Sequence, residues 1–269
     1  MPFDLEQVQE ALAETRFACR IKHFDSVGST NTLALEAAQA GASEGAWIAD
    51  EQTAGRGRGN HSWHSVAGDG LYVSALVKPL IPARNALPIS LATGLAAKSA
   101  IANVTGAVID IRWPNDLLIG TRKCGGILVE TAISPETSGS PAMLRYAVIG
   151  IGINLNHSSF PEELVSAATS LHIETGNIVP REQLLIALLK QIDEEMTLLV
   201  RSWQGTDNGP GVYERFAQAS TWVQGKRVQV AEAGGYTGVT AGIDSQGFLL
   251  VDADDGTRRT VLSGGVREL

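Results

Sequence analysis

Cysteine is scarce in this 269-residue chain, which has only Cys19 and Cys124. Neither lies in a CxxC or CxxH spacing, so a disulfide scaffold, a redox pair and a structural zinc site are all weakly indicated. Long apolar runs are also lacking, because no window reaches the roughly 18 uninterrupted apolar residues of a membrane-spanning helix. The acidic start of the chain lacks the basic and apolar stretches of a secretory signal, so we expect a cytoplasmic protein.

Positive charge is in deficit overall. The chain has 21 lysines and arginines against 29 acidic residues, for a net charge of -8. This balance disfavours a general nucleic-acid binder. Between residues 51 and 130, however, eight basic residues outnumber five acidic ones. This concentration is explained either by chance or by a site for a small anion in that part of the chain.

Apolar residues recur with helical and strand spacing through most of the chain. Hydrophobic residues make up 44% and charged residues 19%, which is typical of a folded globular protein. Several strands in succession, with helices at either end, predict an α+β fold in which helices pack on one face of a mixed sheet. The expected helices lie at 4–16, 32–40, 88–104, 181–203 and 213–219, and the expected strands at 21–25, 47–50, 70–77, 108–113, 116–119, 126–132 and 147–155.

The last part of the chain has a different pattern. After Trp222, short alternating runs are separated by glycine-containing turns. About fifty residues of this kind predict a small SH3-like β-barrel. We therefore expect two domains, a larger one over residues 1–219 and the barrel over residues 220–269.

The most informative segment is the glycine-rich stretch Gly55-Arg56-Gly57-Arg58-Gly59. Alternating glycines let a backbone approach a ligand closely, and two guanidinium groups bind a phosphate or carboxylate bidentately. The motif therefore indicates a site for a phosphorylated ligand. A flexible solvated loop or an RNA-binding Gly-Arg tract has the same composition and stays an alternative.

Other segments place polar or basic groups beside backbone that a ligand could approach. Ser29-Thr30-Asn31 precedes a helix, Asn115-Asp116 follow a proline turn, and Arg122-Lys123 precede two glycines. Each has an ordinary alternative, a helix cap for the first and a turn for the other two. Gly150 and Gly152 alternate with isoleucines, which leaves one side of a strand open for a flat group.

Groups for nucleophilic or metal catalysis are not indicated. The sequence suggests no Ser-His-Asp or Cys-His pairing. His61 and His64 could hold a metal, but their spacing on a loop without a carboxylate companion favours exposed histidines. We therefore assign no metal ligands.

Taken together and in order, these segments resemble the biotin–protein ligases. The similarity extends from about residue 20 to the end of the chain, and five motifs in order are far more specific than any one of them. The motifs are Ser29-Thr30-Asn31, the stretch from Gln52 to Arg58 with Trp63, the stretch from Trp113 to Leu117, Arg122-Lys123 leading into Gly126 to Glu130, and the stretch from Gly150 to Leu155.

The resemblance implies a class II synthetase-like catalytic domain that binds biotin and ATP over residues 1–219, followed by the family's C-terminal barrel. It implies an ATP-dependent biotin–[acetyl-CoA-carboxylase] ligase. Biotin and ATP, with Mg²⁺, would give biotinyl-5′-AMP and pyrophosphate. A lysine of a biotin carboxyl carrier protein, or of a similar acceptor domain, would then take the biotin and release AMP.

The resemblance also bears on partners. Some relatives carry an N-terminal DNA-binding domain, but about 28 residues and one expected helix precede Ser29, so we expect a form without it. We expect no DNA or membrane partner and either a monomer or a homodimer.

The resemblance assigns roles to matching positions. Lys123, Arg58 and Asp116 would be catalytic, with Lys123 bridging the biotin carboxyl group and the phosphate. Asp116 would orient the acceptor lysine or take its proton, and Gly126, Gly150 and Gly152 would form the pocket floor. Biotin would contact Ser29, Thr30, Asn31, Gln52, Arg56, Gly57, Arg58, Lys123 and Gly126, and the nucleotide would contact Arg56, Arg58, Trp63, Asn115 and Asn154.

Two positions depart from the family pattern. Asn60-His61 stand where the glycine-rich loop usually continues with Gly-Arg, and Arg112 stands where lysine is common. A lipoate or octanoate transferase shares the expected catalytic architecture and is the first alternative function. A nucleic-acid binder that uses the Gly-Arg loop is the second, although no aromatic residues interleave with Arg56 and Arg58.

Overall fold

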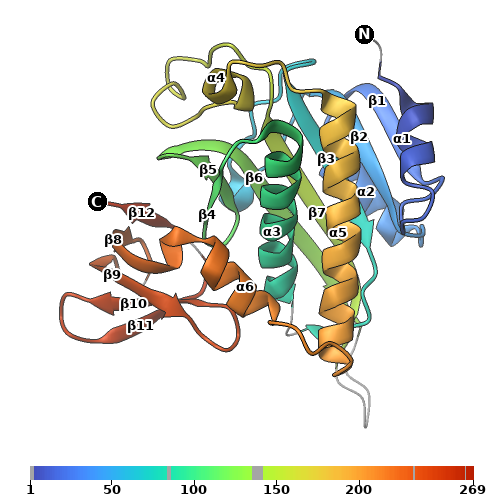
Figure 1. Cartoon of the computed structure of the whole chain (residues 1–269). Helices are drawn as coiled ribbons and strands as arrows, with labels where there is room; N and C mark the ends of the chain where they lie inside the picture. Colours follow the sequence, from blue (N-terminus) through green and yellow to red (C-terminus); the bar gives the residue numbers. More distant parts are fainter. Residues whose placement is uncertain (1–2, 84–85, 135–141, 233, 264) are drawn as a thin grey trace.

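The computed structural model describes residues 3–83, 86–134, 142–232, 234–263 and 265–269. Its larger part is built on a seven-stranded sheet with the order β1-β2-β3-β7-β6-β5-β4 (Figure 1). Strands β1 and β2 run parallel and the other neighbouring pairs antiparallel, so the sheet is mixed. Its strands are β1 (Ile21–Val27), β2 (Gly45–Gln52), β3 (Gly70–Val77), β4 (Asp110–Arg112), β5 (Asp116–Ile119), β6 (Arg122–Ile133) and β7 (Leu144–Asn154).

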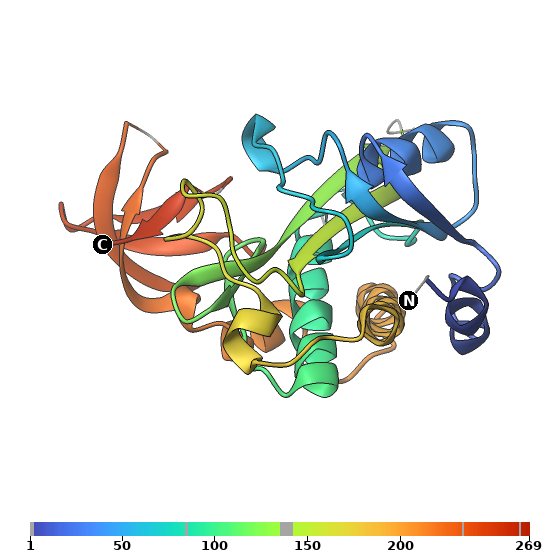
Figure 2. The same cartoon turned by 90° about the horizontal axis from the view of Figure 1, so that it is seen from above.

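Helices cover both faces of this sheet, not one as expected. Along β7, Ile149 and Ile151 join the core that includes α3 and α5, whereas Val148 packs with Ala34 and Ala38 of α2. Because successive strand residues point to opposite faces, α2 lies on the face away from α3 and α5 (Figure 2). The helices are α1 (Leu5–Ala11), α2 (Thr30–Gln39), α3 (Ala86–Thr105), α4 (Leu171–Thr175), α5 (Arg181–Trp203) and α6 (Val212–Ala219).

The two long helices follow directly from their sequences. Helix α5 buries one apolar stripe that includes Leu184, Leu188 and Ile192, and its other side carries charged residues. Helix α3 is apolar nearly all round, because it packs between the sheet, α5 and α6. Its segment Leu87–Thr105 is long and apolar enough to cross a membrane by length and composition alone, a property that buried core helices share.

The C-terminal part forms a second, antiparallel sheet with the order β11-β10-β9-β8-β12. Its contact with the larger part includes a hydrogen bond of 2.9 Å from Trp113 Nε1 to the Gly247 carbonyl. A mixed sheet with helices followed by a small all-β part confirms the predicted fold class. The strands are β8 (Gln224–Val230), β9 (Tyr236–Ile243), β10 (Leu249–Ala253), β11 (Arg258–Val261) and β12 (Val266–Glu268), preceded by the 3-10 helix η3 (Thr221–Val223).

Some predicted boundaries differ from the structure. Helix α1 ends at Ala11 and not near Arg16, because the chain breaks into turns there and Arg16 bonds to Asp193 of α5. Strand β6 begins at Arg122, four residues before the predicted start at residue 126, because Lys123 pairs with Ala168 of a distant loop. Helix α4 and strand β12 are not predicted from the sequence.

Candidate active site

A pocket opens on the sheet face that carries α2, beside that helix. Gly126 of β6 pairs with Gly152 of β7, and Gly150 lies two residues along β7 on the same face. Because these three glycines have no side chains, the sheet backbone itself forms the pocket floor. A Cβ at Gly150 would lie 2.4 Å from Asn31 Oδ1, so no side chain fits there without displacing Asn31.

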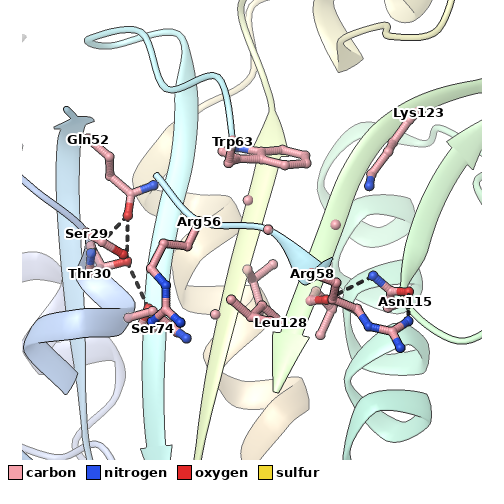
Figure 3. Close-up of a pocket in the computed structure, with 17 residues that line it drawn as sticks. Ser29, Thr30, Gln52, Arg56, Arg58, Trp63, Ser74, Asn115, Lys123 and Leu128 are labelled. Atoms are coloured by element: carbon pink, nitrogen blue, oxygen red, sulfur yellow. Dashed lines mark hydrogen bonds between the residues drawn. The ribbon is translucent and has the colours of Figure 1, made fainter. Parts of the chain in front are cut away.

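Polar side chains gather at the α2 end of the pocket (Figure 3). Gln52 Oε1 accepts hydrogen bonds from the Thr30 amide (2.9 Å) and the Thr30 hydroxyl (3.1 Å). Ser74 Oγ lies 2.9 Å from Thr30 Oγ1 and donates to Asn31 Oδ1 over 2.9 Å. These side chains are therefore joined to one another by hydrogen bonds.

The Ser29 hydroxyl is the exception in this network. Ser29 is the N-cap residue of α2, yet its side chain makes no capping hydrogen bond. Its Oγ is buried and has no hydrogen-bond partner among the described residues. A buried hydroxyl without a partner costs free energy, so this group is available to a ligand in the pocket.

The Gly-Arg loop folds as a tight hairpin over the floor. Arg56 pairs with Ser62, and the Gly57 amide donates to the His61 carbonyl over 2.7 Å. The 3-10 helix η1 (Arg58–Asn60) forms its tip, where Gly59 has a φ of 60° that favours glycine. The loop is thus an exposed hairpin with its own backbone hydrogen bonds, and Arg56, Gly57 and Arg58 line the pocket.

The two arginines of the loop bind at opposite ends of the pocket (Figure 3). Arg56 donates two hydrogen bonds to the Glu130 carboxylate, of 3.0 and 2.9 Å. Arg58 donates to Asn115 Oδ1 over 2.8 Å and to the Ser263 carbonyl of the C-terminal sheet. The motif therefore crosses the pocket from the α2 end to the β5 end.

Electrostatics distinguish Arg58 from the other cations of the site. Burial lowers the pKa of the Arg58 guanidinium, although Asp116 and Glu232 partly oppose this effect. No carboxylate of the described residues lies within ion-pair distance of Arg58. Its charge is thus half-buried without a direct counter-ion.

Lys123 and Asp116 form an ion pair at the β5 end. Lys123 Nζ lies 2.5 Å from Asp116 Oδ1, and Arg112 binds Asp116 Oδ2. Burial alone would raise the pKa of Asp116, but the charges of Lys123 and Arg112 outweigh it and hold this pKa below its ordinary value. Asp116 is therefore ionised at neutral pH and is a weak base.

The Trp63 ring lies flat on the glycine floor. A Cβ at Gly152 would lie 2.4 Å from Trp63 Cε2, and one at Gly126 would lie 3.1 Å from Trp63 Cζ3. Lys123 Nζ is 5.4 Å from the centroid of this ring, and Trp63 Nε1 is buried without a partner among the described residues. A flat ligand on this part of the floor must therefore displace the ring.

The structure brings together all but two of the predicted site residues. Asp116 lies just outside the pocket, behind Lys123. Asn154 is buried at the end of β7, where its side chain donates to the Thr169 carbonyl over 2.9 Å. The pocket lining contains Ser29, Thr30, Asn31, Gln52, Arg56, Gly57, Arg58, Trp63, Asn115, Lys123 and Gly126.

The sequence predicts no role for three side chains that lie at or beside the pocket, namely Ser74, Leu128 and Glu130. Ser74 is a lone polar residue in an otherwise apolar strand, a signal that could have identified it. Leu128 lines the floor between Gly126 and Glu130, and all three lie on one face by strand alternation. In the sequence, Glu130 is distinguished only as an acidic residue that follows an apolar run.

A resident metal ion does not fit this site. The described residues contain no group of three histidine, cysteine, aspartate or glutamate side chains that could hold one. Asp116 and Glu130, which lie beside the pocket, are already paired with cations. Burial also raises the pKa of the Cys124 thiol to about 12, so it is no thiolate nucleophile at neutral pH.

Two family models match the chain. Residues 23–154 match the biotin/lipoate A/B protein ligase family, and residues 224–266 match the biotin protein ligase C terminal domain. The biotin--[acetyl-CoA-carboxylase] ligase of Mycobacterium tuberculosis is 33% identical over 88% of this chain and 84% of its own length. The bifunctional ligase/repressor BirA of Bacillus subtilis is 32% identical over 88% of this chain and 70% of its own.

Solved structures agree with these matches. The biotin protein ligase from Aquifex aeolicus in complex with biotin and ATP superposes with a TM-score of 0.74 and 28% identity. The match covers 93% of this chain and 99% of that one.

Proposed function

The chain belongs to the biotin/lipoate A/B protein ligase family, and from that premise we propose that it is an ATP-dependent biotin–protein ligase. It activates biotin with ATP to biotinyl-5′-AMP and transfers the biotin to a lysine of a carrier-type acceptor domain. Related proteins that carry the biotin ligase name and the Aquifex aeolicus complex with biotin and ATP support this proposal.

The buried Ser29 hydroxyl, which has no hydrogen-bond partner in the described part of the chain, is the observation that supports biotin over lipoate. It lies beside Thr30, Asn31, Gln52 and Ser74, so the α2 end of the pocket is polar. The ureido group of biotin offers two N–H donors and one carbonyl acceptor to such a surface. The dithiolane of lipoate offers neither, and would leave these buried polar groups without a ligand partner.

In the first step, the biotin carboxylate attacks the α-phosphorus of ATP and pyrophosphate leaves. We place the ureido ring at the α2 end and the carboxylate toward Lys123, near the β5 end. Lys123 and Arg58 then stabilise the negative charge that gathers on the phosphate oxygens. Asn115 holds Arg58 in place through their hydrogen bond of 2.8 Å.

In the second step, the amine of the acceptor lysine attacks the acyl carbon of the mixed anhydride, loses its proton to solvent and releases AMP. Of the two roles predicted for Asp116, the orienting one is favoured. A carboxylate with a lowered pKa and two cationic partners is a weak base, but it fixes Lys123 beside the reacting group.

Magnesium arrives with ATP as part of the substrate. The described carboxylates provide no cage for it, so the ATP phosphates and water supply most of its ligands. The predicted nucleotide contact of Trp63 requires the ring to leave the glycine floor and stack on the adenine. The described hydrogen bond of Asn154 to Thr169 favours a structural role for that residue.

Incubation with ATP, either biotin or lipoate, and a biotin carrier domain tests the function. We expect AMP release and labelling of the carrier with biotin only. Labelling with lipoate alone would show that the pocket serves the other branch of the family.

The remaining expectations extend this proposal. We propose that the catalytic domain ends at residue 219 and that residues 220–269 form a separate domain. Family members act on biotin carboxyl carrier domains, and the acceptor of this chain is proposed to be that of acetyl-CoA carboxylase. A cytoplasmic location, the lack of DNA and membrane partners, and a monomeric or homodimeric state stay predictions.

A further inference from the structure

Glu130 lies at the meeting point of three elements. It belongs to β6, on the same sheet face as Gly126 and Leu128. Its Oε2 accepts a hydrogen bond of 2.5 Å from Asn31 Nδ2 of α2. Both terminal nitrogens of Arg56 in the Gly-Arg loop bind the same carboxylate. One side chain therefore connects the sheet, the helix and the loop at the α2 end of the pocket.

This pairing changes the role expected for Arg56. A guanidinium that binds a carboxylate with two hydrogen bonds must give up both before it can bind a phosphate in the same way. Arg58, at the other end of the pocket, has no such partner among the described residues. We therefore expect Arg58 to bind the phosphates, whereas Arg56 binds Glu130 of β6.

We propose that Glu130 is a positioning residue that latches the Gly-Arg loop over the ring-binding end of the pocket through Arg56 while it fixes Asn31. The proposal rests on the biotin ligase function. The loop leaves β2 after Gln52 and returns to the floor at Trp63, so Arg56 and Glu130 tie it down at the end where the ureido ring is placed. The latch opposes escape of the ring and leaves ATP binding at the other end unchanged.

The size of the effect follows from the exposure of the pair. The Arg56 side chain is 42% exposed and that of Glu130 27%, so solvent weakens the attraction between them. The bidentate geometry places the pair at the strong end of such partly exposed pairs. We expect its loss to accelerate biotin release about five- to tenfold, or about 1–1.4 kcal/mol.

Glu130→Gln removes the charge but keeps an oxygen that accepts the Asn31 hydrogen bond, so it tests the latch alone. Arg56→Gln removes the other half, and the double variant completes a cycle. The dissociation rate of biotin from the binary complex and the KM values for biotin and ATP are measured for each. We expect faster biotin release and a higher KM for biotin, a KM for ATP within about twofold of wild type, and a double variant no worse than either single one.

Asp254→Asn provides a matched control. Asp254 of the C-terminal part also binds two nitrogens of an arginine, Arg227, and one neutral donor, Thr237, but it lies outside the pocket. Its loss should alter neither KM. Thermal unfolding of every variant separates loss of the latch from loss of the fold.

Two results would overturn the latch. Wild-type rates of biotin release in both single variants would show that the Arg56–Glu130 pair does not retain biotin. A higher KM for ATP, together with effects of the two single variants that multiply in the double variant, would indicate that Arg56 binds the ATP phosphates and not Glu130. A wild-type protein without biotin-dependent pyrophosphate release would instead refute the proposed function itself, so the two failures are distinguishable.

Discussion

A methyl group added at either of two glycines of the pocket floor should distinguish a loss of biotin affinity from a loss of protein stability. In Gly150→Ala, the new Cβ lies 2.4 Å from Asn31 Oδ1 and 3.0 Å from its Cγ. Asn31 is 3% exposed and is held by Ser74 and Glu130. It cannot turn away from the methyl group without breaking both hydrogen bonds.

The cost of this substitution can be worked out from these contacts. Loss of two hydrogen bonds costs about 1 kcal/mol each, and overpacking costs about 1–3 kcal/mol where the neighbours cannot yield. Replacement of a strand glycine offsets about 0.5–1 kcal/mol. We expect a net loss of about 3 kcal/mol in the free energy of unfolding, or about 6–12 °C in Tm for a chain of this size.

Gly152→Ala provides the contrast. Its Cβ meets the Trp63 ring at 2.4 Å, but Trp63 is only half-buried and its Nε1 has no hydrogen-bond partner among the described residues, so we expect the ring to move off the floor. Its stability should therefore stay within about 0.5 kcal/mol of wild type. Both substitutions narrow the floor, so both should weaken biotin binding at least about tenfold.

Thermal unfolding and equilibrium binding of biotin measure the two effects. Gly211→Ala is the control for added volume, because a Cβ there meets nothing within 4 Å and the backbone of this residue is extended; since Gly211 is the N-cap of α6, its loss should cost about 0.5 kcal/mol of stability and leave biotin binding unchanged. Equal stability of Gly150→Ala and Gly152→Ala would refute the fixed position of Asn31. Wild-type biotin affinity in either variant would refute the glycine floor as the binding surface.

Three further predictions concern Lys123, Arg58 and His157. Lys123→Ala should lower biotin-dependent pyrophosphate release at least about a hundredfold, since a charge that stabilises the transferred group is lost; near-normal release would contradict its role. Arg58→Gly should still form biotinyl-5′-AMP but release it faster, which the dissociation rate of the adenylate measures; a slower release than wild type would be inconsistent with this role. His157 is 2% exposed and burial lowers its pKa below the ordinary 6.5, so the unfolded chain binds its proton first as pH falls. The free energy of unfolding should therefore be unaffected by His157 above pH 6.5 and decline below it, and His157→Gln should flatten that decline in unfolding curves across pH.

Local patterns predicted those parts of the site that depend on residues close together in the chain. The Gly-Arg loop and the alternating Gly150 and Gly152 are such cases, since glycine spacing directly determines where backbone lies bare. The Ser29 triplet suggested both a helix cap and a ligand contact. The structure gives Ser29 the cap position without the capping hydrogen bond, a result that only the surrounding pocket determines.

Features that depend on distant pairings could not be predicted in this way. Glu130 acquires its role from Arg56 and Asn31, which lie 74 and 99 residues earlier in the chain. Helix α2 is rich in alanine and leucine, which predicts a helix but not the face of the sheet on which it packs. Its position on the pocket side depends on Trp47, Leu76 and Val148, which come from three different strands.

The concentration of basic residues between positions 51 and 130 is explained by which of them already have a counter-ion. Arg56 is paired with Glu130, and Lys123 and Arg112 share Asp116. Among the described residues, Arg58 binds the neutral oxygens of Asn115 and Ser263 and forms no ion pair, and burial lowers its pKa by more than the charges of Asp116 and Glu232 raise it. A phosphate placed beside it would provide that missing charge and would restore its pKa. Arg58 is thus a pocket arginine without a paired carboxylate in the described part of the chain, and this is the physical reason to expect the anionic part of the ligand at the β5 end of the pocket.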